Sequence, residues 1–555
     1  MKLIYLTLGL IVLASFAQAQ GIYNNGAQIV AGTGSGSGSY WVVSKGNFTL
    51  TSTNAAKPAT MDNLTILSDG TLTLAPTTCL TVNNAVSNAN TAGSGLVVKS
   101  SAAGTGSLIT PSVTISGNAT AERWLSARKW NLVSSPVIQS VSGFLAANTA
   151  IASSGSTRSM MDFNANQAAW SPLFSNGANN GSVGMGKGYA MHVSPNNAAV
   201  TSSGSLQAGT ITISGLKPGS WNCIGNPFTS ALGVNDESIT TEDFLTYNVF
   251  NNANLDPSYG AIYISEKEDD SSNKPGGYSI ISNVPLTSAT NSIPQGQAFM
   301  VKLKPGATSV TFRKSMQLHS PTLALKAGAI VWPTIKLTAT IGGVAAESII
   351  AFNDLMTLGR DPTYDVGYMK IDKDLSLYSR LVEDNGEPFA IQSLPGNNIS
   401  TLVIPLGLES VSGGPVVFSA ESLGLPSNCK VILEDKVTNT FTDLQSGTYK
   451  LTVAANSNIP NRFQLRTGVL TTDPGPKVGD LIAYLFSNTE IRVEGDVTAS
   501  AVADLYDTLG RKVLTQKLNP GGLNIVTTSS VSSGMYLLKV VDKGTLHTFK
   551  FLIRQ

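Results

Sequence analysis

Short runs of alternating apolar and polar residues dominate the chain from about residue 20 onward. Leu64-Thr65-Ile66, Leu72-Thr73-Leu74 and Leu80-Thr81-Val82 follow one another at a spacing of eight. This period of two is typical of half-buried strands. Because a rung can bury its apolar side chains by stacking on a neighbouring rung, we expect residues 20–118 to form a short β-solenoid, with a β-sandwich as the alternative.

The pattern changes after residue 118, where the strands are longer and aromatic residues are more frequent. Residues 119–325 and 330–467 carry alternating runs, among them residues 298–301 and 335–341. Gly and Pro separate the runs, and no long stretch with a period of 3.6 residues predicts a substantial helix. We therefore predict an all-β, multidomain chain in which these two regions are β-sandwiches of jelly-roll-like arrangement.

The N-terminus has the pattern of an export signal. Met1-Lys2 is followed by an apolar run over residues 3–13 and by the small-x-small sequence Ala17-Gln18-Ala19. This order predicts a secretory signal peptide over residues 1–19. The run is too short to span about 30 Å of hydrocarbon, and no later segment reaches 18 consecutive apolar residues. We expect an exported protein that does not span a membrane once the signal peptide is removed.

The C-terminal part is set apart by residues 468–479, which we interpret as a linker because Pro474 and Pro476 would interrupt a strand ladder. Residues 480–555 then read as a compact all-β module. Its sequence contains LYDTLGRKV at residues 505–513, SGMYLLKV at 533–540 and the basic-apolar strand FKFLIR at 549–554.

This last module resembles the C-terminal sorting domain of the type IX secretion system of Bacteroidetes, an Ig-like β-sandwich. The resemblance implies recognition by the translocon, removal by a sortase-like protease, and delivery to the outer-membrane surface or the extracellular space. The residues that match the family's sorting motif are Leu509, Gly510, Arg511, Val513, Gly534, Tyr536, Lys539 and Lys550.

Two further resemblances concern the regions before the linker. Trp130-Asn131 and Trp221-Asn222 open a paired motif that resembles large Bacteroidetes surface proteins, which are described as adhesins or are uncharacterised. Glu434-Asp435, Tyr449 and Arg462-Phe463 resemble a module that often precedes the sorting domain. These resemblances imply a location and an architecture, but no ligand.

The charge, cysteine and histidine content of the chain limits the partners and cofactors that we expect. Lys and Arg total 36 and Asp and Glu 35, so the net charge is +1, and only 13% of residues are charged. This balance argues against a nucleic-acid partner, which favours a basic surplus. The three cysteines have no paired spacing, so we expect small buried residues, with one long-range disulfide as the alternative. The three histidines form no zinc motif.

One glycine-rich stretch approaches a phosphate-binding loop. Gly181 and Gly186-Lys187 have the required spacing, but Gly188 stands where the motif needs Ser or Thr, and no helix is expected to follow. We therefore expect a hairpin in which Lys187 lies over Tyr189.

Two acidic stretches are weak candidates for Ca²⁺, which takes six to eight oxygen ligands. We expect no obligate cofactor, and solvated loops are the alternative reading for both stretches. The candidate ligands are Glu268, Asp269 and Asp270 in one stretch, and Asp372, Asp374 and Ser376 in the other.

No catalytic motif is evident, so the leading hypothesis is a non-enzymatic adhesin that binds a glycan or a matrix protein. A structural component of an extracellular layer and a glycan-active hydrolase with a carboxylate pair are the alternatives. Aromatic rings can stack on sugars, and Trp41, Trp170 and Trp332 lie in polar or loop-like surroundings, although core packing is the favoured reading for each single tryptophan.

Overall fold

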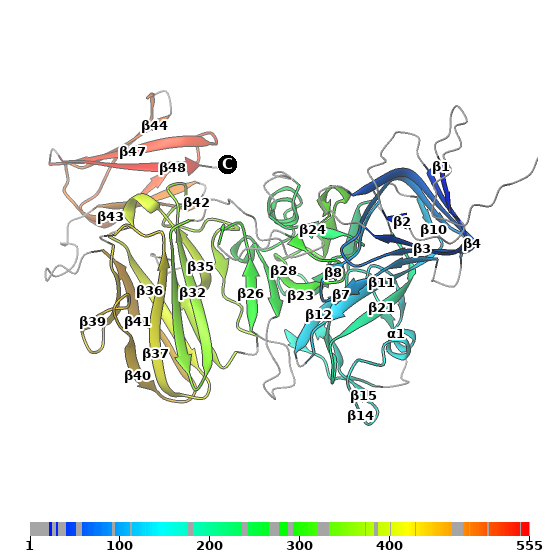
Figure 1. The fold of residues 1–555 in the computed structure, drawn as a ribbon. Coiled ribbons are helices and arrows are strands. Elements are labelled where there is room, and N and C mark those ends of the chain that lie inside the picture. Colours follow the sequence, from blue (N-terminus) through cyan, green and yellow to red (C-terminus); the bar gives the residue numbers. More distant parts are fainter. Residues whose placement is uncertain are drawn as a thin grey trace, which may run out of the picture. The chain divides into compact units, whose positions relative to one another are not determined.

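The structure is a computed structural model that confirms the all-β prediction (Figure 1). It describes residues 21–553 except 25–28, 31–39, 52–57, 91–94, 111–113, 128, 176–180, 208, 236–241, 266–276, 287–291, 320–331, 372, 382–386, 400, 428, 469–480, 488, 508–509 and 544. Two compact units form: Met1–Val331 with Pro362–Lys373, and Trp332–Asp361 with Asp374–Gln555. The predicted signal peptide over residues 1–19 and most of the linker lie outside the described residues.

The first unit begins with strands that stack in parallel, as a β-solenoid requires. Leu72 pairs in register with Phe48 on one side and with Leu96 on the other, and all three side chains are buried. These strands bury their apolar side chains in one continuous core. The strands are β3 (Tyr40–Thr51), β4 (Ala59–Leu74), β5 (Cys79–Asn88), β6 (Leu96–Val98), β9 (Ser107–Ile109), β10 (Thr114–Ser116) and β11 (Asn118–Leu125), with β1 (Gly21–Asn24) and β2 (Ile29–Val30) beside β3.

The runs that recur at a spacing of eight are not successive rungs of the solenoid. Residues 64–66 and 72–74 follow one another along the single strand β4, and neither stacks on the other. Leu72 instead stacks on Leu96, so a coil has the length of three such runs. The physical reason is that parallel neighbours need a long return connection, which one short run cannot supply. The sheet also passes the expected boundary at residue 118, because β11 pairs antiparallel with β21 (Ala198–Ser205).

The remainder of residues 119–325 consists of two halves with the same order of elements. Four-stranded antiparallel sheets β12-β20-β16-β17 and β23-β28-β25-β26 occupy equivalent places. A short helix follows β13 in the first half, α1 (Val141–Ala147), and β24 in the second, α2 (Phe244–Thr246) with η2 (Tyr247–Asn251). The first half contains β12 (Trp130–Ser134), β13 (Gln139–Ser140), β16 (Met160–Asn164), β17 (Ala169–Trp170), β19 (Ser182–Val183) and β20 (Gly188–His192). The second contains β22 (Ile211–Ser214), β23 (Trp221–Gly225), β24 (Ala231–Gly233), β25 (Ile262–Ser265), β26 (Tyr278–Ile281), β27 (Ser292–Ile293), β28 (Ala298–Lys302) and β29 (Ser309–Phe312).

Equivalent positions of the two halves make reciprocal contacts. The amide of Ser134 donates to the carbonyl of Gly296 at 2.9 Å, and the amide of Gly225 donates to the carbonyl of Gly186 at 2.9 Å. Ser134 ends β12 as Gly225 ends β23, and the acceptor glycines Gly186 and Gly296 each lie two residues before a strand, β20 and β28. Such exchange of identical contacts is the mark of a two-fold relationship, here within one chain.

The paired tryptophan–asparagine motif of the sequence has a structural role in both halves. The side chain of Asn131 donates to the carbonyls of Ser126 and Lys129, and that of Asn222 donates to the carbonyls of Lys217 and Ser220. Each asparagine thus fastens the turn before its own strand. The resemblance in sequence therefore reflects a duplicated fold rather than a ligand site.

Part of the region 330–467 packs within the first unit. The segment Pro362–Lys373 belongs there, although the sequence groups it with the following strands. The hydroxyl of Tyr263 donates to the carbonyl of Gly367 at 2.8 Å, and the amide of Asn283 donates to Thr363. A side chain at Gly367 would collide with the ring of Tyr259, so only glycine permits this close approach.

In the second unit, residues 332–361 and 374–467 form a curled sheet with the strand order β39-β38-β41-β36-β34-β35-β32-β31-β37-β40. A core of aliphatic and aromatic side chains fills it. The two strands at the ends of this order, β39 and β40, follow one another in the chain. The strands are β31 (Thr334–Ile341), β32 (Val344–Phe352), β34 (Leu375–Ser379), β35 (Phe389–Leu394), β36 (Val403–Ser410), β37 (Gly414–Leu423), β38 (Val431–Asp435), β39 (Thr440–Asp443), β40 (Tyr449–Val453) and β41 (Ser457–Thr467).

The charged residues of the second sequence motif join the strands of this sheet. Asp435 is buried and accepts hydrogen bonds from Arg462 at 2.8 and 2.6 Å and from the Tyr449 hydroxyl. Burial alone would raise the pKa of Asp435, but the hydrogen bonds from Arg462 and Tyr449 lower it well below its usual value. Asp435, Tyr449 and Arg462 lie on three different strands, β38, β40 and β41. The motif therefore stabilises the fold by joining these strands.

The C-terminal module is a β-sandwich, as expected for a sorting domain. Its sheets have the strand orders β42-β43-β46 and β45-β44-β47-β48, and their inner faces share one core. Each described pairing within them is antiparallel. The strands are β42 (Ile482–Ser487), β43 (Glu490–Val497), β44 (Val502–Asp507), β45 (Lys512–Lys517), β46 (Gly521–Thr527), β47 (Gly534–Asp542) and β48 (Thr545–Ile553).

Candidate functional site

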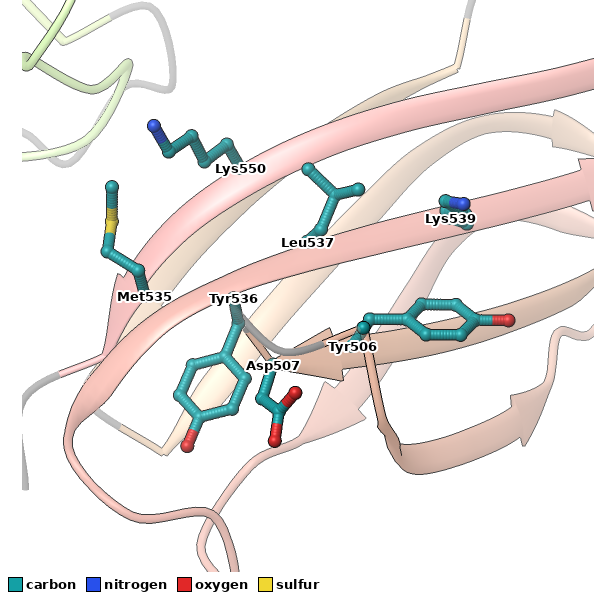
Figure 2. A pocket seen from close by; sticks show the side chains of 8 residues that line it. Tyr506, Asp507, Met535, Tyr536, Leu537, Lys539 and Lys550 are labelled. Carbon is teal, nitrogen blue, oxygen red and sulfur yellow. The ribbon is translucent and has the colours of Figure 1, made fainter.

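A pocket of about 420 Å³ opens on the C-terminal module, where β44 ends. Strands β44, β47 and β48 and the turn after β44 supply its walls (Figure 2). Gly510 has a φ of 77°, a value that glycine adopts without strain, and it lets the chain turn back into β45. The lining residues are Tyr506, Asp507, Gly510, Met535, Tyr536, Leu537, Lys539 and Lys550.

Strand periodicity explains why these side chains meet. Successive residues of a strand point to opposite faces, so Met535, Leu537 and Lys539 share the outer face of β47, whereas Tyr536 enters the core. Lys550 of β48 pairs in register with Leu537 and lies on the same outer face. Figure 2 shows Met535, Leu537 and Lys550 on one side of these strands, with Tyr536 pointing to the other.

The charges around the pocket are unequally balanced. Lys512 forms an ion pair with Asp504 at 2.7 Å, and Asp507 accepts from Arg511 at 2.7 Å. Lys539 instead lies 5.0 Å from the centre of the Tyr506 ring, a cation–π distance. In the part of the chain that the structure describes, neither Lys539 nor Lys550 has an ion-pair partner. One rim of the pocket is therefore cationic above an apolar floor.

The structure brings together half of the predicted sorting-motif residues. Gly510, Tyr536, Lys539 and Lys550 line the pocket. The others have different surroundings: Arg511 and Val513 are exposed near the turn, Gly534 opens β47, and Leu509 lies outside the described residues.

The sequence analysis missed four lining residues, Tyr506, Asp507, Met535 and Leu537. Because side chains alternate along a strand, the position of Lys539 would have predicted that Met535 and Leu537 lie on the same face of β47 as Lys539. Tyr506 and Asp507 of β44 reach the pocket only because β44 pairs with β47. The sequence motif does not encode this pairing.

The solenoid carries a second candidate surface, a row of hydroxyl side chains across neighbouring strands. Thr49, Thr73, Val97, Thr120 and Ser203 pair in register, in that order, from β3 through β4, β6 and β11 to β21. Their neighbours along each strand point into the core, so the row faces outward. Thr49, Thr73 and Val97 are separated by 24 residues in the sequence, and this spacing would have predicted the first part of the row.

Of the three tryptophans considered for sugar stacking, two are half-buried and one is buried. Trp170 is buried, contacts Phe163 edge to face and donates to the Tyr278 hydroxyl at 3.3 Å, so its ring fills the core. Trp41 is half-buried against Phe48, and Trp332 is half-buried as well. Core packing, the favoured reading, therefore holds for Trp170, because Phe163 of β16 and Tyr278 of β26 contact its ring system.

The suggested Ca²⁺ ligands are dispersed or not described. Glu268, Asp269, Asp270 and Asp372 lie outside the described residues. Asp374 is exposed just before β34, while Ser376 is buried within it. Among the described residues, no three His, Cys, Asp or Glu side chains gather as a metal site.

The glycine-rich stretch forms the expected lysine contact. Lys187 pairs with Asp162 at 3.0 Å and lies 5.2 Å from the centre of the Tyr189 ring. Strand β20, and no helix, follows it. The three cysteines, Cys79, Cys223 and Cys429, are buried and free, as expected of small core residues.

His319 has a structural role in the first unit. Its Nε2 lies 2.9 Å from the Thr81 hydroxyl and its Nδ1 lies 2.7 Å from the Ser107 hydroxyl. The imidazole therefore joins the residue after β30 (Gln317–Leu318) to two solenoid strands. Desolvation lowers the pKa of His319 to about 4, so the ring is neutral near pH 7.

Comparison with known protein families supports the assignment of the C-terminal module. Residues 487–554 match the secretion system C-terminal sorting domain, which defines the class: a substrate of the type IX secretion system, exported to the cell surface or the extracellular space. Residues 38–467 match the domain of unknown function DUF8693, and the chain belongs to this family. No helix among the described residues is long and apolar enough to cross a membrane.

Other comparisons add little. No curated protein matches the chain. One similar solved structure is a biofilm associated protein, BSP domain, with 8% identity, a TM-score of 0.16, and coverage of 78% of this chain and 92% of that chain. A similarity this low supports no conclusion about fold or function.

Proposed function

We propose that the exported chain is a non-enzymatic adhesin that binds a neutral glycan polymer through the hydroxyl face of its solenoid. The observation that carries this proposal is the in-register row Thr49, Thr73, Thr120 and Ser203, which Val97 interrupts once. A flanking row adds Asn47, Thr71, Asn118 and Ser205.

The geometry suits a repeating ligand. Neighbouring strands lie about 4.8 Å apart, so equivalent side chains recur at that interval across the sheet. Hydroxyl and amide groups both donate and accept hydrogen bonds, as sugar hydroxyls do. Threonine on a strand has few accessible rotamers, so ordering these side chains on binding costs little entropy.

The charge of the surface favours a neutral partner. The residues of the two rows carry no ionisable group. The nearest lysine on the next row, Lys99, forms an ion pair with Glu122 at 2.6 Å. An anionic polysaccharide would find no cation on the two rows themselves, whereas hydrogen bonding alone can hold a neutral chain.

A binding assay with the mature full-length protein tests the proposal. We would measure pull-down on insoluble neutral glycans and on charged glycans, each with and without Ca²⁺. The variant Thr49→Lys/Thr73→Lys projects two long charged side chains from the face and is expected to abolish binding to the neutral glycans.

Thr338→Lys is the matched control, because Thr338 is also a half-buried threonine on a strand, in β31 of the second unit. It should bind like the native protein. Equal binding by the double variant, or no retention on any neutral glycan by a folded native protein, would contradict the proposal.

A further inference from the structure

The pocket of the sorting module has two properties that together define its ligand. Its floor is apolar, formed by Met535, Leu537 and the aromatic ring of Tyr506, and its rim carries Lys539 and Lys550. We propose that this pocket binds an acidic protein segment, with one large apolar side chain of the segment in the pocket and flanking carboxylates on the two lysines.

The lysines are placed to act on one segment. Leu537 pairs with Lys550 and Lys539 pairs with Thr548, so the two lysines are diagonal neighbours on adjacent strands. Diagonal positions of this kind lie about 7–8 Å apart at their Cα atoms, within the reach of two long side chains. Two carboxylates of one extended segment, or a single one between the lysines, can contact both ammonium groups.

The other charges of the face do not compete for this ligand. Asp507 is held by Arg511, and Asp504 is held by Lys512 at 2.7 Å. Lys539 has a ring contact with Tyr506, which leaves the hydrogen-bonding capacity of its ammonium for a carboxylate. The imbalance therefore favours an anion at the rim, while the apolar floor excludes a fully hydrated ion as the whole ligand.

The size of the pocket agrees with a single side chain. A volume of about 420 Å³ is at the lower end of pockets that enclose small ligands, about 300–1,000 Å³. A large apolar side chain and the backbone next to it fit that space. β48 is also the last strand in its sheet order, so an extended segment has access along it.

A competing explanation is that Lys550 only discourages association of edge strands, which is a common use of lysine on such strands. Edge protection by Lys550 would require neither Lys539 nor the apolar floor of the pocket. It predicts self-association of a Lys550 variant and no effect on peptide binding, so one experiment separates the two explanations.

The test uses the mature full-length chain and three labelled peptides of equal length. The first contains Phe between Asp and Glu residues, the second has Ser in place of Phe, and the third has Lys in place of the acidic residues. Fluorescence anisotropy at low salt should show binding of the first peptide alone. Added salt should weaken that binding, because the lysines at the rim are solvent-accessible.

Three variants locate the interaction. Lys539→Gln/Lys550→Gln should weaken binding of the first peptide about tenfold, the effect of losing two partly exposed ion pairs. Leu537→Ser should weaken it by a similar factor by making the floor polar. Lys517→Gln, which removes an exposed lysine at the far end of β45, is the matched control and should bind normally.

The thermal melting temperature of each variant checks that the module is folded. Binding of the lysine peptide or the serine peptide as tightly as the first, or native affinity in the double lysine variant, would overturn the proposal. So would the absence of binding by all three peptides. Self-association of Lys550→Gln with unchanged peptide binding would establish the edge-protection role instead.

Discussion

Asn148 and Asn248 make the same three hydrogen bonds in the two halves of the first unit. The amide nitrogen of Asn148 donates to the carbonyls of Phe144 and Thr201, and its oxygen accepts from the amide of Thr201. The amide nitrogen of Asn248 donates to the carbonyls of Phe244 and Thr311, and its oxygen accepts from the amide of Thr311. Each asparagine thus joins a short helical segment to a later strand, Asn148 to β21 and Asn248 to β29.

This equivalence predicts equal effects of mutation. Asn148→Ala and Asn248→Ala each remove the side-chain partner of a threonine amide and carbonyl, in Thr201 or in Thr311, at a cost of about 1–3 kcal/mol for each group. The Phe144 and Phe244 carbonyls still accept from a backbone amide. We expect each variant to lower the free energy of unfolding by about 3 kcal/mol. Denaturant unfolding measures this effect, and Asn196→Ala, at an exposed turn residue, should have almost none. Native stability of either variant would show that the two positions are not equivalent.

The stability of the first unit should depend on the protonation of His319. Its folded pKa of about 4 lies below the ordinary 6.5, so between these values the unfolded state binds more protons and stability falls as the pH falls. The slope is at most about 1.4 kcal/mol per pH unit. Above pH 6.5 the effect is absent.

His319→Gln provides the control, because glutamine keeps a donor and an acceptor but does not titrate. Melting temperatures from pH 7 to pH 4 should fall less steeply for this variant than for the native chain. Parallel curves would mean that His319 is not the group responsible.

The network around Asp435 should be far more sensitive than an exposed ion pair. Asp435→Asn removes a fully buried charge from Arg462, and breaking a buried pair in this way costs about 3 kcal/mol or more. Glu347→Gln breaks the solvent-exposed pair with Lys336 and should cost less than about 1 kcal/mol. Chemical denaturation of the two variants checks the difference, and similar losses would contradict a structural lock at Asp435.

Export should require the C-terminal module. Deletion of residues 480–555 removes every strand of the sorting sandwich and should leave the passenger in the periplasm. Cell fractionation followed by immunoblotting measures this, with Lys517→Gln as an intact control. Surface or medium localisation of the truncated chain would contradict the assignment of the module.

The strands, the sorting module and the burial of the cysteines were predictable from the sequence because each is a local property. Alternation in residues 335–341 gives β31 its faces whichever strand lies beside it. The turn at Gly510 and the strand through Tyr536 likewise depend on a few neighbouring residues. The expected contact of Lys187 with Tyr189 followed from their separation by two residues, since Lys187 directly precedes β20 and Tyr189 lies in it.

Only the tertiary structure decided which distant segments meet. The coil length of the solenoid, the burial of Trp170 under Tyr278 and the placement of Pro362–Lys373 in the first unit all depend on pairings between residues far apart in the chain. The pocket is a further case, since Tyr506 and Lys550 meet through β47, which lies between their strands. A local pattern fixes the face of a side chain, but its neighbours across the sheet depend on strand register, which forms only when the chain has folded.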